Sequence, residues 1–514
     1  MWQRFSIEDF WIIIHYIGRM LIFLAISEIV PLLVALGLSE WNAMSRYLLG
    51  GSVAFVAGIL CMLPMPNSHK LSNKNAMAVV GLSWIVLTVF AAIPLFLSGH
   101  YVSYLDSVFE SMSALTTTGA SMVNNLDHMA QADVMWRIFM QCIGGCGVVV
   151  IATSLGMFGR SLDSSLYASE GRSEHVVPNI VTTSRFIVKY SLIITLIAAA
   201  LLGFICVLKG MEPVRGFLNG AWLAMASFAT GGMTSMSPGI VYYHSGMLEV
   251  IVLIVILLGS INFTLHNEVW RGHLVHFFKD LEIRTLFVWL LAICALFVAC
   301  LCAADIFDEF PILLRHTVFT VVSAFSSTGF QTISTNQLAS VIPGGAIMVL
   351  AFCMMVGGSS GSTNGGIKVF RIGVMFKELI AFFKDVTAPD SARQVVTYYH
   401  VGRHPLTVSL VRANMAVIFI YTIVLLVAVV VTLAYGYDAS IAVFECTSMT
   451  SNIGMSAGII SPGMPDLLKV IYIFCMWAGR LEFIAIIATI FCLISSIGNT
   501  CRKHKKKVQG LFSN

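Results

Sequence analysis

Four short polar segments interrupt an otherwise apolar sequence, and all four share one pattern. Each ends in a glycine, with a Ser or Ala six residues earlier and an aromatic residue ten residues earlier. They read SALTTTG, ASFATGG, SAFSSTG and SMTSNIG, with closing glycines Gly119, Gly232, Gly329 and Gly454 and aromatic residues Phe109, Trp222, Phe319 and Phe444. Four copies of one unit in one chain predict a pseudo-four-fold object whose polar loops meet at an axis.

The sequence around these segments is typical of an integral membrane protein. Hydrophobic residues make up 58% of it and charged residues 11%, against roughly 25% charged residues in soluble domains. Apolar runs of about 20 residues, long enough to span a bilayer, recur from end to end. The first run is too long for a signal peptide and no cleavage site follows it. Most of the twelve cysteines lie in apolar runs, which indicates small hydrophobes and no disulfide framework.

These features predict an all-α integral membrane protein with four span–re-entrant hairpin–span repeats around a single pore, preceded by two extra transmembrane helices. The two preceding spans occupy residues 1–75, and the repeats occupy 76–182, 183–283, 284–405 and 406–514, the last with a basic tail. The descending arm of the first hairpin, Tyr104 to Leu115, is about half as long as a spanning helix. Since irregular backbone cannot face lipid, each hairpin must be buried by protein or line water.

The loop charges predict the orientation in the bilayer. Loops opposite the hairpins carry nineteen Lys and Arg residues, and the hairpin side carries six: Arg46, Arg137, Lys209, Arg215, Arg315 and Lys469. By the positive-inside rule the hairpins open outward, and the N- and C-termini are cytoplasmic. The tail RKHKKK sets topology in this interpretation, with binding of lipid headgroups as the alternative.

The residues that close each hairpin are suited to a monovalent cation. Backbone carbonyls can replace a hydration shell, and glycine can take a positive φ that turns consecutive carbonyls to one side. A helical arm would point its partly negative C-terminal end at the axis. The candidate cation ligands are Thr117, Thr118, Gly119, Thr230, Gly231, Gly232, Ser327, Thr328, Gly329, Asn452, Ile453 and Gly454. The alternative is that these small residues only permit close helix packing; four copies in matched registers favour the ion.

A run of small residues interrupts an apolar span of the third repeat and is called here the Gly-rich segment. It consists of Gly357, Gly358, Ser359, Ser360, Gly361, Ser362, Thr363, Asn364, Gly365 and Gly366. Because each glycine costs a helix about 1 kcal/mol relative to Ala, we predict that the span breaks here into a loop, which is expected in the third repeat only. A loop below the hairpins would be a gate; the alternative is a passive kink.

Arg480 also lies within an apolar span, where a charge costs at least ~2.5 kcal/mol and must face the pore or a partner. Facing the pore, it would be a positive barrier in the gate. The alternative is a structural ion pair with a carboxylate such as Glu110 or Glu445, which both stand nine residues before a closing glycine. Lys368 is expected to snorkel to the interface, and Glu482 to lie on a different helix face from Arg480.

Three motifs resemble the Trk/Ktr/HKT superfamily of potassium transporters: the four glycine hairpins, the run GGSSGSTNGGIKV (Gly357 to Val369) and GRLE (Gly479 to Glu482). The two preceding spans make the chain most similar to the bacterial TrkH branch. The resemblance implies a potassium uptake subunit of the bacterial inner membrane, a homodimer gated by an intramembrane loop and by a cytosolic TrkA-like ring of nucleotide-binding domains. It implies K+ as the transported ion and no cofactor bound in this chain.

The same resemblance gives a reason to examine the four closing glycines. In this family they favour potassium, and a Ser at the first position goes with sodium passage. All four positions are Gly here, although Asn452-Ile453 and Gly231 depart from the Thr-Gly pattern.

Two other functional classes are weighed against a gated pore. An ion-coupled symporter, driven by protons or sodium with alternating access, also uses broken helices, but it usually has two-fold inverted repeats. An intramembrane enzyme would need a base near the buried serines, and no HExxH motif or nearby His occurs in the spans. We therefore predict no enzyme. We also expect no nucleic-acid partner, and the lipid bilayer as the surroundings.

Overall fold

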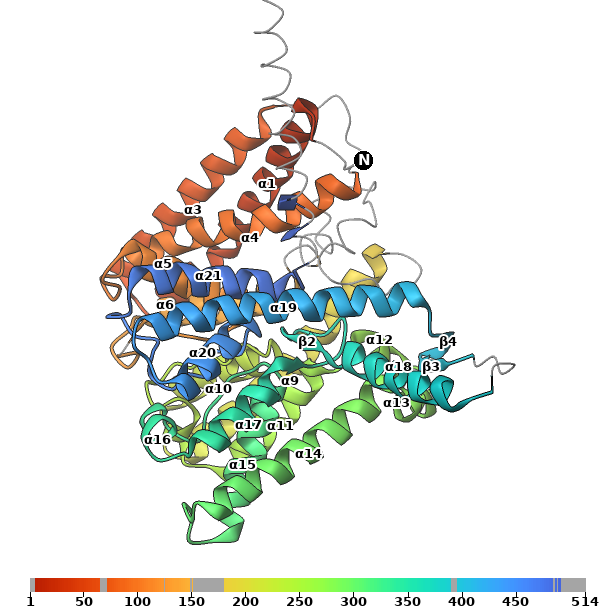
Figure 1. Cartoon of the computed structure of the whole chain (residues 1–514). Coiled ribbons are helices and arrows are strands. Elements are labelled where there is room, and N and C mark those ends of the chain that lie inside the picture. Colours follow the sequence, from red (N-terminus) through yellow and green to blue (C-terminus); the bar gives the residue numbers. More distant parts are fainter. Residues whose placement is uncertain are drawn as a thin grey trace, which may run out of the picture.

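A computed structural model describes residues 5–64, 72–123, 125–147, 150, 180–389, 395–483, 486–487 and 489–490. This part of the chain is largely helical (Figure 1). Six of its helices are long and apolar enough to cross a membrane, and a seventh span results if α11 (Gly246–Ser260) and α12 (Phe263–Trp270), bent by 102°, are counted as one. Helical spans are expected, since a helix satisfies its own backbone polar groups in lipid.

Each predicted repeat contains an outer helix, a short helix and a second helix. The outer helices are α4 (Asn73–Phe96), α9 (Ile180–Leu208), α14 (Leu281–Ala303) and α19 (Val408–Ala434). The short helices are α5 (Tyr104–Leu115), α10 (Pro213–Phe228), α15 (Phe310–Phe325) and α20 (Ala439–Thr450). The second helices are α6 (Gln131–Cys146), α11, α17 (Gly344–Met355) and α21 (Asp466–Arg480). The descending arm predicted at Tyr104 to Leu115 is α5, with the same bounds.

The start of each short helix follows from its sequence. Ser103 caps α5 in a capping box with Asp106, and the side chain of Asp438 caps α20. Both α10 and α15 begin with a Pro in the first turn, where its missing N–H costs nothing. The four short helices therefore begin at residues that the sequence specifies.

The packing of the repeats forms a closed cycle. In each repeat the outer helix packs against the short helix of that repeat. Each second helix packs against the short helix of the following repeat: α6 on α10, α11 on α15, α17 on α20 and α21 on α5. The last contact joins the fourth repeat to the first, so the four short helices are arranged around one axis.

Three helices precede the repeats: α1 (Ile7–Ser27), α2 (Ile29–Gly37) and α3 (Trp41–Met62). They lie against the first repeat at one end of the molecule (Figure 1). Polar contacts fix them to the start of α6. The carboxylate of Glu40 accepts the backbone N–H groups of Gln131 (2.9 Å) and Ala132 (3.1 Å). Asp133 accepts from Arg46 (2.9 Å) and from the Tyr47 hydroxyl (2.7 Å).

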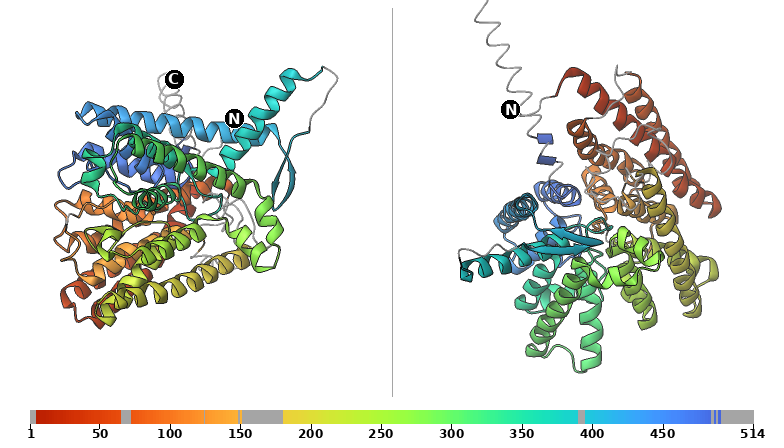
Figure 2. Two further views of the ribbon diagram at one scale, coloured as in Figure 1. Left: turned by 90° about the horizontal axis from the view of Figure 1, so that it is seen from below. Right: turned by 90° about the vertical axis from the view of Figure 1, so that its right-hand side faces the viewer.

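Small elements complete the described chain. They are η1 (Gly239–Tyr243), α13 (Leu274–Lys279), α16 (Thr335–Ser340), α18 (Val369–Thr387) and the strands β1 (Val356–Gly357), β2 (Ile367–Lys368), β3 (Thr397–His400) and β4 (Gly402–Pro405). Strands β1 and β2 pair in parallel, and β3 and β4 form an antiparallel hairpin. The all-α prediction missed both pairs. Figure 2 shows α18 and the β3–β4 hairpin projecting from the helical body.

Interruptions of the second helices are not confined to the third repeat. Helix α6 ends at Cys146, before Gly147 with φ 91°. Helix α11 bends sharply into α12, and α21 ends at Arg480, before positive φ values at Glu482 and Phe483. The third repeat differs in the length of its insertion, residues 356–368 between α17 and α18.

Candidate functional site, a ring of four loops

Four loops follow the short helices and are called here the ring loops: residues 116–119, 229–232, 326–329 and 451–454. In the first, the Thr117 N–H donates to Ala114 O (3.1 Å) and the Thr118 N–H donates to Ser113 O (2.8 Å). This is a Schellman cap, which ends a helix with one left-handed residue. The left-handed residues are Thr117 (φ 57°), Thr230 (50°), Ser327 (51°) and Asn452 (55°). The Ser or Ala six residues before each closing glycine supplies the carbonyl that accepts this bond.

Each closing glycine lies directly against the neighbouring ring loop. All four have positive φ, between 71° and 88°. A Cβ atom would lie 2.1 Å from Gly231 O if built on Gly119, 1.9 Å from Thr328 O if built on Gly232, 1.8 Å from Ile453 O if built on Gly329 and 2.0 Å from Thr118 O if built on Gly454. The contacts run from the first loop through the second, third and fourth and back to the first. Glycine is therefore required both by its conformation and by the close approach of a carbonyl.

The burial of the candidate cation ligands repeats in the same way. The two residues before each closing glycine are buried, whereas all four glycines are partly exposed. The hydroxyl groups bind mainly within the loops: Thr118 Oγ1 contacts Thr116 Oγ1 (2.8 Å), and Thr328 Oγ1 contacts Ser326 Oγ (2.8 Å). Among the twelve candidate ligands, only the four closing glycines therefore keep exposed surface.

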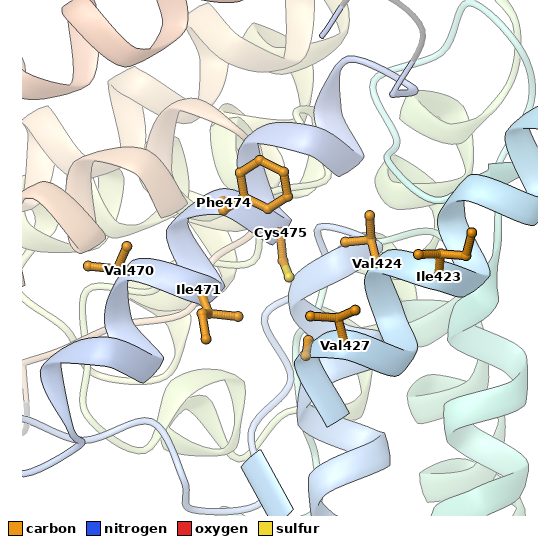
Figure 3. Close-up of a pocket in the computed structure, with 8 residues that line it drawn as sticks. Ile423, Val424, Val427, Val470, Ile471, Phe474 and Cys475 are labelled. Carbon is orange, nitrogen blue, oxygen red and sulfur yellow. The ribbon is translucent and has the colours of Figure 1, made fainter. Parts of the chain in front are cut away.

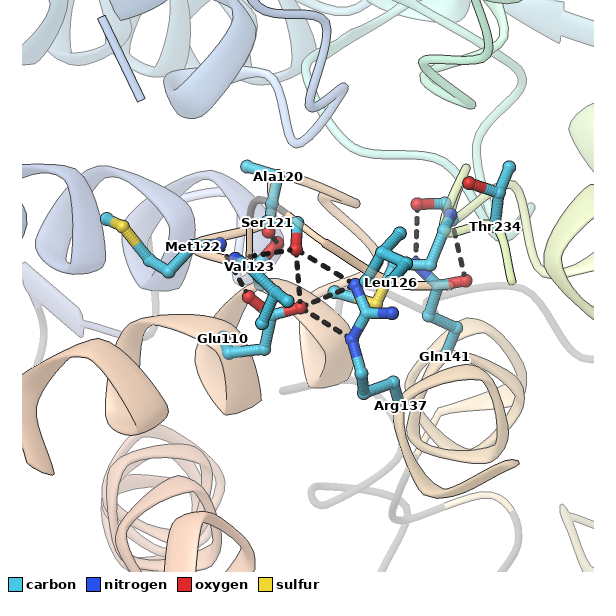
Figure 4. Close-up of polar contacts among 12 residues, drawn as sticks. Glu110, Ala120, Ser121, Met122, Val123, Leu126, Arg137, Gln141 and Thr234 are labelled. Carbon is cyan, nitrogen blue, oxygen red and sulfur yellow. Dashed lines mark hydrogen bonds and ion pairs between the residues drawn. The ribbon is translucent and has the colours of Figure 1, made fainter. Parts of the chain in front are cut away.

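Two buried carboxylates support the chain that leaves the ring, and Figure 4 shows the first, Glu110. Glu110 accepts from Met122 N (2.7 Å), Ser121 Oγ (3.1 Å) and Arg137 Nε (2.6 Å). Glu445, at the matching position of the fourth repeat, accepts from Ser456 Oγ (2.7 Å) and from the N–H groups of Ala457 (2.7 Å) and Ile459 (3.2 Å). Neither carboxylate pairs with Arg480, so these two residues are not its partners.

Arg137, which was counted on the hairpin side, pairs with Glu110 inside the protein. It lies in α6 and its side chain is completely buried. The signal was available, because a charged residue in an apolar helix needs a partner inside the protein.

The second helices approach the ends of the short helices through glycines. A Cβ atom on Gly144, Gly259 or Gly479 would lie 1.7, 2.2 or 2.1 Å from the carbonyl oxygen of Leu115, Phe228 or Thr450, respectively. Each of these glycines is the fourteenth residue of its helix, and Gly357 takes that place after α17. The same small residue at the same place brings the second helices under the ring.

The Gly-rich segment lies between these helix ends. Its two ends are joined by the pairing of β1 with β2. The Thr363 hydroxyl contacts Gly259 O (3.0 Å) and Thr230 Oγ1 (2.8 Å), a residue of the second ring loop. A Cβ atom on Gly365 would lie 2.6 Å from Ser451 O in the fourth ring loop. The segment is therefore fitted between the second and fourth ring loops.

Arg480 lies where the Gly-rich segment meets the first repeat. Its guanidinium donates to the carbonyl oxygens of Thr363 and Gly144, and Nη1 lies 3.4 Å from the Thr117 hydroxyl. Its Cζ atom is 5.8 Å from the centre of the Trp84 ring. One positive group thus contacts a ring loop, the Gly-rich segment and the end of α6.

Two expectations about neighbouring charges were wrong. Glu482 lies in the turn after α21, not on a helix face, and it pairs with Arg371 of α18. Lys368 does not snorkel: it is 5% exposed, and its Nζ donates to Asn364 O (2.7 Å) within the Gly-rich segment. Both side chains hold the segment and the following helix in place.

A chain of polar contacts joins the Gly-rich segment to the projecting hairpin. The Ser360 N–H donates to the buried Glu282 carboxylate (2.7 Å) at the start of α14. Asp280 caps the same helix. Its Oδ2 atom lies 3.0 Å from Nδ1 of His400 in β3 and accepts a hydrogen bond from Val401 N (3.3 Å). Sequence reasoning missed this connection because its members lie far apart in the chain.

A cavity of about 420 Å³ lies away from the ring, between α19 and α21 (Figure 3). It is lined by hydrophobic residues and one cysteine: Ile423, Val424, Val427, Ala428, Val470, Ile471, Phe474 and Cys475. A surface without polar side chains offers a cation no ligands, so the ring remains the candidate site.

Comparisons with known proteins agree with this architecture. Residues 46–496 match the family model TrkH, described as a cation transport protein. The chain is 31% identical to an uncharacterized cation transporter of Methanocaldococcus jannaschii, over 94% of this chain and 96% of the relative. It is 27% identical to the Trk system potassium uptake protein TrkH of Halomonas elongata, over 92% of this chain and 97% of that protein. The crystal structure of the potassium transporter TrkH from Vibrio parahaemolyticus superposes with a TM-score of 0.78 at 25% identity, covering 93% of this chain and 98% of that one.

The buried pair between Glu110 and Arg137 gives a test of this description. Replacing Arg137 with Met should lower the free energy of unfolding by about 3–5 kcal/mol, because Glu110 would stay buried without its cation. Arg315→Met is the matched control: Arg315 binds Glu249 through two hydrogen bonds but is 49% exposed, so its loss should cost about 1 kcal/mol or less. Unfolding in detergent measures both, and equal losses would contradict the prediction.

Proposed function

The chain belongs to the TrkH family of cation transport proteins, so it is a multi-pass membrane transporter and not an enzyme. From this premise we propose that it takes up potassium ions through a pore at the axis of the four ring loops. The closed ring of glycines and carbonyl groups is the observation that carries the proposal. A ring of neutral oxygens suits a weakly hydrated monovalent cation, since carbonyl groups can replace its water.

Potassium is supported by the chemistry of the ring and by the names of the relatives. Each short helix directs its C-terminal end, with partial negative charge, toward the ring. The nearby carboxylates Glu110 and Glu445 bind other groups of the protein, so the ion would meet dipoles rather than charges. Relatives from several bacteria are named potassium uptake proteins. The candidate ligands of the ion are the twelve ring residues predicted from the sequence.

The gate in this proposal consists of the Gly-rich segment and Arg480. Thr363 and Gly365 contact two opposite ring loops from one side, and Arg480 donates to the same segment. Ions that have passed the ring would therefore meet a loop and a positive charge. Opening requires the segment to move, and the β1–β2 pairing would keep its ends in place as it does.

Regulation from the cytosol would use the contacts at the projecting hairpin. The loop charges predict that the four re-entrant hairpins of the repeats open outward and that both termini are cytoplasmic. Asp280 and Glu282 then connect the β3–β4 hairpin to the Gly-rich segment. We propose that a TrkA-like nucleotide-binding ring acts on this surface, and that the transporter works as a homodimer in the bacterial inner membrane.

The first prediction of this proposal concerns the ring. Gly329→Ser should reduce discrimination between potassium and sodium, because the new side chain would displace Ile453 O. Losing the contact of one carbonyl oxygen with the cation should lower the potassium-to-sodium selectivity roughly ten- to a hundredfold. Reversal potentials in mixed salts measure it. Gly345→Ser is the control, since a Cβ atom there meets nothing within 4 Å. Unchanged selectivity at Gly329 would exclude this ring as the filter.

The second prediction concerns the Gly-rich segment. Deleting residues 360–364 should raise flux through the purified protein and weaken its dependence on a cytosolic partner. The deletion removes the contacts of Thr363 but leaves β1 and β2. Rubidium uptake into proteoliposomes, normalised to the amount of folded protein, provides the measurement. If total uptake falls only in proportion to the amount of folded protein, so that the normalised flux is unchanged, the passive kink is supported instead.

The third prediction concerns Arg480. Arg480→Ala should increase cation flux by removing a positive charge from the path, and Arg480→Lys should stay close to the wild type. Since neither Glu110 nor Glu445 depends on Arg480, we expect the Ala variant to remain folded. Thermal stability and rubidium uptake are measured on the same preparation. A folded Ala variant with unchanged uptake would show that Arg480 is no barrier.

A further inference from the structure

The second ring loop differs from the others in the residue before its closing glycine. That residue is Gly231, where the other loops have Thr118, Thr328 and Ile453. The structure gives the reason. A Cβ atom on Gly231 would lie 2.4 Å from Cδ of Gln141 and 2.7 Å from both of its terminal atoms. The amide of Gln141, from α6 of the first repeat, therefore occupies the space that a side chain would need.

Gln141 holds the second ring loop on both sides of Gly232 (Figure 4). Its Nε2 donates to Gly231 O (2.6 Å), and its Oε1 accepts from Met233 N (3.4 Å). The side chain is completely buried. Gly231 O is also the atom that lies against Gly119, so the hydrogen bond is made to one of the four ring carbonyls.

The other second helices have no such group. Gln141 is the eleventh residue of α6, and the eleventh residues of α11, α17 and α21 are Ile256, Met354 and Met476. All three are apolar and buried. The amide is thus specific to one position of a pseudo-four-fold site.

We propose that Gln141 is a specificity-determining residue of the ring, an inference that rests on the proposed function. The hydrogen bond fixes the direction of Gly231 O and shares its lone-pair density with an N–H group. A carbonyl that is fixed in place and has a weaker field favours the larger of two monovalent cations. Without Gln141 the oxygen can move closer to sodium.

Gln141→Met tests this inference, since Met stands at the same place in α17 and α21. The potassium-to-sodium permeability ratio should fall roughly three- to tenfold, the effect of one neutral hydrogen bond. Thermal stability is measured on the same protein. An unchanged ratio in a folded variant would overturn the inference. If Gly329→Ser changes selectivity in the same assay and Gln141→Met does not, the inference fails and the filter stands. If neither does, the proposed function fails.

A second pair of variants separates specificity from packing. Gly231→Thr alone should destabilise the protein, because the side chain meets Gln141, and adding Gln141→Ala should restore folding by freeing that space. If the hydrogen bond sets specificity, the folded double variant remains less selective than the wild type. Recovery of full selectivity in the double variant would show that Gln141 only fills space, and would overturn the inference.

Discussion

The structure depends on the contact between each closing glycine and the carbonyl group of the next ring loop. A single methyl group at any of the four glycines would come within about 2 Å of that oxygen. The loops can therefore approach this closely only if these four residues are glycine. The surrounding helices must then hold four chain segments at this separation. In three repeats they do so through a second set of glycines, Gly144, Gly259 and Gly479, which let the second helix lie on the last carbonyl of the short helix. Both contacts are made by backbone, which explains how repeats with different side chains keep one geometry.

Charged groups surround this neutral centre in separate layers. Glu110 and Glu445 bind the chain that leaves the ring on one side, and Arg480 lies with the Gly-rich segment on the other. Burial makes an unpaired charge expensive, so the carboxylates are satisfied by an arginine or by backbone N–H groups. In the proposed path, the ring itself would offer a cation dipoles, which bind it less tightly than a carboxylate would.

Much of the fold could be predicted, because the hairpin pattern recurs four times in the sequence. The short helix α5 has the bounds predicted for it, Tyr104 to Leu115. The break near Arg480 and the bend after α11 were missed, since each follows from one or two residues whose conformation is set by packing. The roles of Arg137 and Gln141 were missed for a related reason. Each acts on a group many residues away, and no local pattern in the sequence indicates which partner the fold will supply.

The closed order of the ring also limits how the four repeats can diverge. The space for a side chain in one loop is decided by a residue of another repeat, as Gly231 and Gln141, 90 residues apart in the chain, illustrate. A substitution in one loop would need its compensating change in a different repeat. The ring therefore ties the four repeats to one another, because the room for a side chain in one of them is set by its neighbours.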